Sequence, residues 1–162
     1  MSASPFHSFL GTPILFLTVQ VRCGLPILGD RKALEILRET WLRSAKRDQW
    51  LVGLYQIMPD QVNLLACSGP TARPVADWIV VWKATAAVRI KAVMGGRGSL
   101  WESGAKQELV RSAAEYAARC SSLQAGPGHP LEAGVGPASG HWGMQWQILP
   151  VGMAAGLAVN AT

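Results

Sequence analysis

The stretch YQIMPDQVNLL, residues 55–65, decides the fold of this chain. Its centre, Pro59-Asp60, favours a tight turn between two strand-like runs, residues 50–58 and 61–68, and so predicts an antiparallel hairpin. Side chains alternate along a strand, and Gln61 and Asn63 therefore share one face. Two histidines at such positions could hold one metal ion together, whereas this chain has two amides there.

Helical and strand-like patterns surround this hairpin on both sides. Asp30 suits the N-cap of an amphipathic helix, and Pro74 suits the first turn of a second helix. Ser112 and Glu115 have the spacing of a capping box at the start of a third helix. Strands are predicted at 14–22 and within 99–110, and an irregular loop rich in Gly and Pro at 124–145.

This order of elements predicts an α+β fold, a ferredoxin-like or RRM-like antiparallel sheet with helices packed on one face. The domain is expected to span residues 12–135, between an N-terminal extension, 1–11, and an irregular C-terminal tail, 136–162. With 162 residues, of which 49% are hydrophobic and 15% charged, the chain has the composition of one globular domain.

Charge and cysteine content narrow the class of protein. A net charge of +5 is compatible with a polyanionic partner but does not require one. The three cysteines are odd in number and lack CxxC spacing, so neither a disulfide framework nor a thiolate zinc site is suggested, and a reducing cytoplasm is expected. No apolar run approaches the roughly 20 residues of a spanning helix, so no membrane partner is expected.

The hairpin resembles the signature of the REP-associated tyrosine transposases, a family of single-strand HUH transposases. That signature has a tyrosine, two apolar residues, Met-Pro-Asp, and two histidines separated by a hydrophobic residue and followed by two apolar ones. This chain substitutes Gln61 and Asn63 for the histidines. It keeps Tyr55, Met58, Pro59, Asp60, Val62, Leu64 and Leu65.

Further similarities to the family follow in the same order along residues 12–135. They are Leu17-Thr18-Val19 in the first strand, Trp82-Lys83 in the helix after the hairpin, Gly98-Ser99-Leu100-Trp101-Glu102 for the family's Gly-x-Leu-Trp-Gln, Arg111-Ser112 with Glu115-Tyr116 at the start of the late helix, and His129 to Gly134 for Asn-Pro-Val-Arg-Ala-Gly.

The resemblance implies specific chemistry. In the active relatives the paired histidines hold a divalent metal, Mg or Mn, and a tyrosine on the late helix attacks single-stranded DNA to form a 5′-phosphotyrosine link. Alignment places Ser122 at the position of that tyrosine, and amide oxygens are weaker ligands than imidazole for first-row metals. This chain is therefore expected to hold no metal cofactor and to be inactive in cleavage.

The same resemblance implies a partner, single-stranded or hairpin DNA. The expected contacts are the basic residues that follow the hairpin, Lys83, Arg89, Lys91 and Arg97. Since relatives include dimers, a homodimer is a further expectation.

Two alternatives stay open. In the first, enzyme activity survives, with Asp60, Glu108 or Glu115 helping to hold Mg or Mn and Ser122 or Tyr116 as the nucleophile. In the second, the chain is a non-catalytic protein that dimerises through its sheet, or a decayed transposase with no DNA role.

Several of these residues also have an ordinary structural interpretation. The two amides of the hairpin can be polar residues on the open face of a half-buried strand. Tyr55 and Tyr116 are expected to pack in the core with a hydroxyl at the surface. Trp78 and Trp82, four residues apart on a helix, could form a base-stacking platform, but such pairs more often belong to the core.

Overall fold

The computed structural model describes residues 12–22, 30–58, 60–96, 98–125 and 132–135. The predicted N-terminal extension, 1–11, and the tail, 136–162, lie outside these residues. The elements follow in the order β1 (Ile14–Gln20), α1 (Arg31–Arg47), β2 (Trp50–Ile57), β3 (Gln61–Ser68), α2 (Val75–Met94), β4 (Lys106–Leu109), α3 (Ala113–Ala125) and β5 (Glu132–Val135). No helix among the described residues has the length and apolar character needed to cross a membrane.

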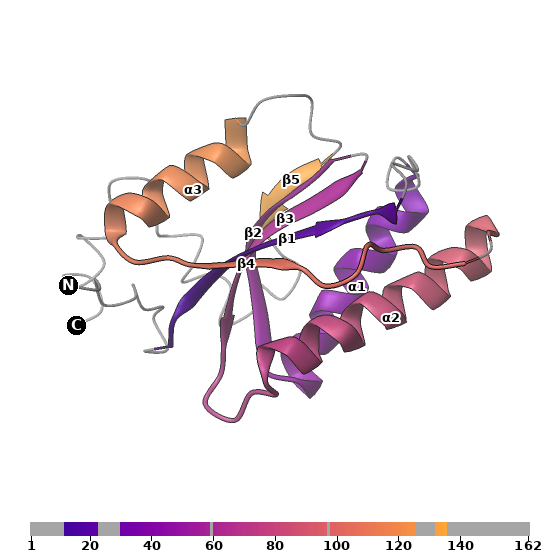
Figure 1. The fold of residues 1–162 in the computed structure, drawn as a ribbon, viewed down its shortest axis with the longest axis horizontal. Helices are drawn as coiled ribbons and strands as arrows, with labels where there is room; N and C mark the ends of the chain where they lie inside the picture. The colour runs from indigo at the N-terminus through magenta and orange to yellow at the C-terminus, as the bar shows by residue number, and fades with distance from the viewer. Residues whose placement is uncertain (1–11, 23–29, 59, 97, 126–131, 136–162) are drawn as a thin grey trace.

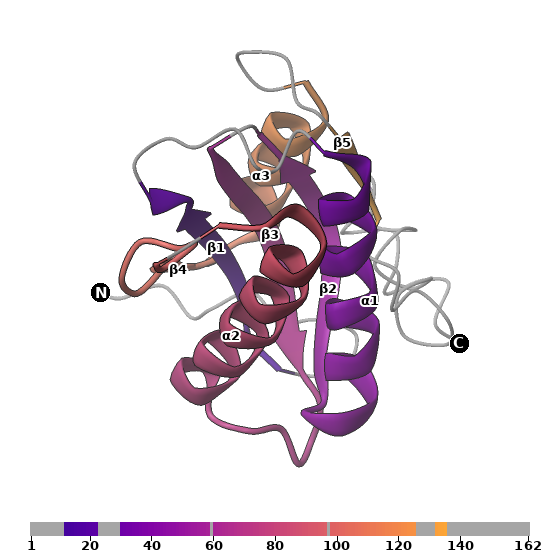
Figure 2. The same cartoon turned by 90° about the vertical axis from the view of Figure 1, so that its right-hand side faces the viewer.

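The strands form one sheet in the order β4-β1-β3-β2-β5, with every neighbouring pair antiparallel. The first four strands in this order, with α1 and α2, give the predicted ferredoxin-like topology. Helices α1 and α2 lie side by side on one face of the sheet (Figures 1 and 2), as predicted. Helix α3 lies on the opposite face and adds a third layer.

The helix boundaries follow from local signals in the sequence. The carboxylate of Asp30 accepts a hydrogen bond from the backbone N–H of Lys32 at 2.7 Å, which satisfies one of the free donors in the first turn of α1. Pro74 precedes α2, and Gly95, with a φ of 76°, ends it by donating its N–H to the carbonyl of Lys91. The Ser112 half of the capping box also forms, because Ser112 Oγ accepts from the N–H of Glu115 at 3.1 Å, while the Glu115 carboxylate accepts the N–H of Arg111, one residue before Ser112.

The larger core lies between the sheet and the two helices α1 and α2, and it is built around aromatic rings. Trp78 and Trp82 are fully buried in it, so they are core residues and not a stacking platform at the surface. Trp78 stacks on Trp50 with ring centroids 4.8 Å apart. Trp82 meets Trp41 and Trp101 edge to face. These contacts fix α2 against both α1 and the sheet.

A smaller core lies under α3, on the other face of the sheet. Tyr116, Cys120 and Leu123 project from one side of α3 and pack on Leu65 and Cys67 of β3. Tyr116 and Tyr55 are both packing residues, as predicted. The hydroxyl of Tyr116 is not at the surface, however, because the whole side chain is buried. This burial and the neighbouring Cys120 thiol raise the pKa of the phenol far above its ordinary value.

Two predictions for the second half of the chain differ from the structure. Within 99–110 only residues 106–109 form a regular strand, while Trp101 makes an isolated bridge to Val21. Residues 132–135, predicted to be part of a loop, form β5 and pair with β2. Their sequence, EAGV, has no strand pattern, and the backbone pairing to β2 overrides it.

Candidate functional site

The two amides of the hairpin lie on the face of the sheet that α3 partly covers. In β3, Val62 and Leu64 point into the core under α1 and α2, whereas Leu65 belongs to the core under α3. By the same alternation Gln61 and Asn63 point to the α3 side, both half-buried. The predicted shared face is therefore present.

Asn63 is part of a line of polar side chains that crosses four strands. The register places it between Thr18 of β1 and Gln56 of β2, and Thr18 faces Lys106 of β4. The hydroxyl of Thr18 donates to Asn63 Oδ1 at 3.0 Å, and Asn63 Nδ2 donates to Gln56 Oε1 at 3.4 Å. We call Lys106, Thr18, Asn63 and Gln56 the polar row.

These hydrogen bonds determine what Asn63 can do. Its carbonyl oxygen, the atom that would have to serve as a metal ligand, already accepts a hydrogen bond from Thr18. Gln56 at the end of the polar row is almost fully buried. The amide of Asn63 is thus held in the sheet as part of a polar network. This agrees with its interpretation as an ordinary polar residue on a half-buried strand.

The next residues along the strands continue the polar surface. Gln61 pairs with Gln20 of β1, which is exposed. Asp60, in the turn before β3, has an exposed side chain, and its backbone carbonyl accepts the N–H of Val21 at 2.8 Å. Asp60 thus contributes a backbone hydrogen bond that joins the hairpin to the end of β1.

A cavity of about 340 Å³ opens beside the polar row, between the end of β1 and the segment that leads into β4. Lys106 and Glu102 give it one charge of each sign. Its lining consists of Thr18, Gln20, Glu102, Ser103, Gly104, Ala105 and Lys106. The sequence predicted neither Lys106 nor Thr18 as a site residue, because only the pairing of β1 with β3 and β4 brings them to Asn63.

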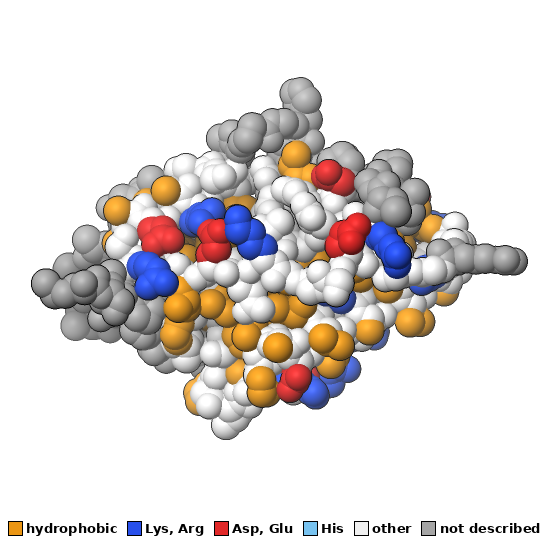
Figure 3. All heavy atoms as spheres, in the orientation of Figure 1, with side chains coloured by type: hydrophobic (Ala, Val, Ile, Leu, Met, Phe, Trp, Pro, Cys, Tyr) orange, Lys and Arg blue, Asp and Glu red, His pale blue; other side chains and the backbone are white. Residues whose placement is uncertain are grey.

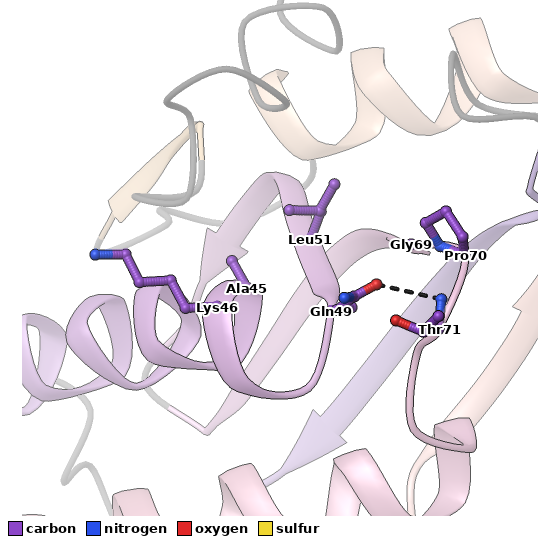
Figure 4. Close-up of a pocket in the computed structure, with 7 residues that line it drawn as sticks. All are labelled: Ala45, Lys46, Gln49, Leu51, Gly69, Pro70 and Thr71. Atoms are coloured by element: carbon purple, nitrogen blue, oxygen red, sulfur yellow. Dashed lines mark hydrogen bonds between the residues drawn. The ribbon is translucent and has the colours of Figure 1, made fainter.

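A second cavity, of about 390 Å³, lies at the other end of the sheet, by the end of α1 and the turn after β3 (Figure 4). Gln49 and Thr71 point toward one another there, and the N–H of Thr71 donates to Gln49 Oε1 at 3.2 Å. Among the described residues of its lining, Lys46 alone is charged. None of the described residues that line this cavity belongs to the polar row.

The two candidate nucleophiles lie on different sides of α3. Tyr116 is fully buried against the sheet, and its raised pKa keeps the phenol protonated, so it is not placed to attack a substrate. Ser122 is exposed, and six residues of helix put it about 240° around the axis from Tyr116. The hydroxyl of Ser122 is thus turned away from the side of α3 that packs on the sheet.

Two of the three carboxylates proposed to hold a cation, Glu108 and Glu115, are engaged in other contacts. Glu108 forms ion pairs with Lys106 and Arg119, which hold the pKa of its carboxyl below the usual range. Glu115 accepts the backbone N–H of Arg111 at 2.9 Å. Among the residues that the structure describes, no three His, Cys, Asp or Glu side chains gather as a metal site.

The basic residues after the hairpin do not form one surface. The ammonium of Lys83 is nearly buried and donates to the carbonyls of Glu102 and Gly104 at 2.8 and 2.6 Å. Arg89 pairs with Glu39. Lys91 donates to the carbonyl of Gly98. Arg97 lies outside the described residues. The expected run of DNA contacts is therefore not continuous, and Lys83 supports the segment before β4.

Replacing Lys83 by methionine should lower the free energy of unfolding by about 1 kcal/mol, because two loop carbonyls lose their donor. Burial lowers the pKa of Lys83, and the charge of Glu102 opposes this shift. The unfolded chain then binds the proton more tightly than the folded protein. Stability of the wild type should therefore rise with pH in the alkaline range below the ordinary lysine pKa.

Urea denaturation of both proteins at a series of alkaline pH values measures this contribution. The difference between wild type and Lys83→Met isolates it from other titrating groups. Lys32→Met, a change at an exposed position of α1, serves as the control. Equal pH slopes for wild type and Lys83→Met would contradict the burial of this ammonium.

The fold and the hairpin with its polar row define a class of domain: a ferredoxin-like sheet in which two amides, Gln61 and Asn63, share one face of the central hairpin. Protein-family profiles and curated protein sequences give no match to the chain.

Solved structures do match. A REP-associated tyrosine transposase bound to a REP hairpin aligns with a TM-score of 0.53 and 12% identity, over 74% of this chain and 68% of that one. A candidate transposase from Deinococcus radiodurans R1 aligns with a TM-score of 0.53 and 18% identity, over 75% and 95%. The chain thus has the fold of a REP-associated tyrosine transposase, as the sequence resemblance implied.

Proposed function

We propose that this chain is a DNA-binding protein of the transposase type that does not cleave DNA. The observation that carries the proposal is the hydrogen-bonded polar row, which includes Asn63, one of the two positions where the resemblance places the family's histidines. An amide that is already engaged with Thr18 and Gln56 is a poor metal ligand, and without a bound cation the scissile phosphate is not polarised.

The arrangement of possible nucleophiles supports the same proposal. Tyr116 is inaccessible, and Ser122 is turned away from the sheet-facing side of α3. A serine hydroxyl also needs a neighbouring base in order to attack, and no His lies among the described residues.

Binding of DNA is supported by the bound REP hairpin of the matched transposase and by the net charge of +5. We place the contact at the polar row and the cavity beside it. Lys106 would pair with phosphate, as would Arg22, which is exposed two residues beyond Gln20. Gln20, Gln61 and Thr18 offer hydrogen bonds to exposed bases of a single strand. The expected compartment is the cytoplasm.

The test is a titration of labelled palindromic single-stranded DNA, followed by fluorescence anisotropy at several salt concentrations between about 50 and 200 mM. Affinity should fall steeply with salt, and Lys106→Glu should bind more weakly than wild type. Lys32→Glu on α1, an equal change of charge at an exposed site, should bind as wild type does.

Absence of binding, or binding that salt does not weaken, would refute DNA binding. The proposed lack of cleavage is tested separately. The protein is incubated with the labelled strand and Mn, and a denaturing gel shows whether a covalent protein-DNA adduct has formed. An adduct with the native chain would refute the proposed inactivity.

A further inference from the structure

The outward face of α2 is unusually apolar for a helix at the surface. Val80 and Val88 are 67% and 70% exposed, and Ala84 between them is exposed as well. Figure 2 shows α2 on the outside of the molecule beside α1, and Figure 3 shows hydrophobic side chains over it along the lower edge. A surface helix usually presents charged or polar residues to water, so this face is suited to a partner.

The residues of this face form a straight line along the helix; four of them are exposed, and Lys91 is half-buried. Asp77, Val80, Ala84, Val88 and Lys91 follow one another at spacings of three, four, four and three residues. At 100° per residue all five lie within about 40° of the direction of Ala84. That direction is opposite to Trp82, which points into the core. We call these five residues the α2 seam.

The charges of the α2 seam are complementary to those of a second copy of the same helix. Asp77 lies seven residues before Ala84, and Lys91 lies seven residues after it. When two copies of α2 pack antiparallel about a two-fold axis at Ala84, Asp77 of each copy faces Lys91 of the other. The valines of the two copies then pack between these ion pairs. A pattern that is complementary to itself in this way fits an isologous interface.

We propose that the chain forms a homodimer through the α2 seam, with the two α2 helices antiparallel. The small side chain of Ala84 allows the two helices to approach closely at the centre. Lys91 is half-buried and donates to the carbonyl of Gly98, and its ammonium has two further N–H donors for an aspartate. The inference does not depend on DNA binding, because the polar row lies on the other face of the sheet.

The size of the α2 seam determines how tightly the two copies are expected to associate. A helix of 20 residues is about 30 Å long, and one helix pair covers less surface than the roughly 1,200–2,000 Å² of a stable interface. The dimer should therefore dissociate on dilution. Sedimentation velocity of the full chain over a wide range of concentrations should show a monomer at the lowest and a dimer at the highest.

Charge variants test the seam itself. Asp77→Lys and Lys91→Asp should each be monomeric at concentrations where the wild type is a dimer, because like charges then face each other. An equimolar mixture of the two variants should form a heterodimer, since every facing pair again has opposite signs. Glu35→Lys on α1, an equal change of charge at an exposed site, should dimerise as the wild type does.

Two further measurements make the outcome decisive. Far-UV circular dichroism establishes that each variant is folded. Ala84→Glu, at the exposed centre of the seam, should abolish the dimer while Asp77 and Lys91 are left unchanged. A wild type that stays monomeric at all concentrations would overturn the proposal. The proposal would also be overturned if Asp77→Lys and Lys91→Asp each still formed a dimer. The same holds if an equimolar mixture of the two variants did not associate.

Discussion

Replacing Trp82 by alanine should lower the free energy of unfolding by about 3–5 kcal/mol. Trp82 is fully buried, and its ring centroid lies 5.9 Å from that of Trp41, 6.3 Å from Trp78 and 5.7 Å from Trp101. Alanine would leave a cavity at the point where α1, α2 and the segment before β4 meet. Domains of this size are stable by only about 5–15 kcal/mol, so the loss is a large fraction of the total.

Urea denaturation followed by far-UV circular dichroism measures this loss without relying on tryptophan fluorescence. Two controls bracket it. Leu42→Ala removes a partly exposed side chain and should cost much less. Trp82→Phe keeps an aromatic ring and removes an indole N–H that has no hydrogen-bond partner among the described residues, so it should cost less than alanine. A loss below about 1 kcal/mol for Trp82→Ala would contradict its central place in the core.

Placing histidine at both positions 61 and 63 of the hairpin should create a metal site that binds cations more tightly than the wild type does. In the variant Gln61→His with Asn63→His, two imidazoles project from the same face of β3. Imidazole is a stronger ligand than an amide for first-row metals, and affinity should rise from Mn to Cu. Isothermal titration calorimetry with each cation measures the gain over the wild type.

The single variants are the matched controls for this gain, since one imidazole cannot chelate. Asn63→His also breaks the hydrogen bonds to Thr18 and Gln56, so the stability of each variant must be measured beside its metal affinity. Equal affinities for the single and double variants would show that positions 61 and 63 do not share an ion. The prediction of cleavage inactivity would then lose its structural basis.

Local signals explain why most of the fold could be predicted from the sequence. Asp30 and Ser112 make the capping contacts that their positions suggest, and β2 and β3 pair antiparallel as the expected hairpin. These features depend on residues close in sequence. The same is true of the shared face of Gln61 and Asn63, because alternation along one strand fixes it.

Contacts between distant segments explain what the sequence did not reveal. Thr18 and Lys106 join Asn63 only through the pairing of β1 with β3 and β4, which no local pattern specifies. The sequence suggested Lys83 as a DNA contact because it is a basic residue after the hairpin. Its ammonium instead donates to the carbonyls of a segment some twenty residues further along the chain. The third layer, α3, likewise follows from tertiary packing of Tyr116 and not from its own pattern.

The lengths of the outermost strands have a consequence for self-association. The sheet ends on both sides in a strand of four residues, β4 and β5, whereas its central strands have seven or eight. Short edge strands, with the charged Lys106 and Glu108 on β4, offer a poor template for strand addition. The protein should accordingly resist edge-to-edge aggregation, and copies that associate should do so through helices.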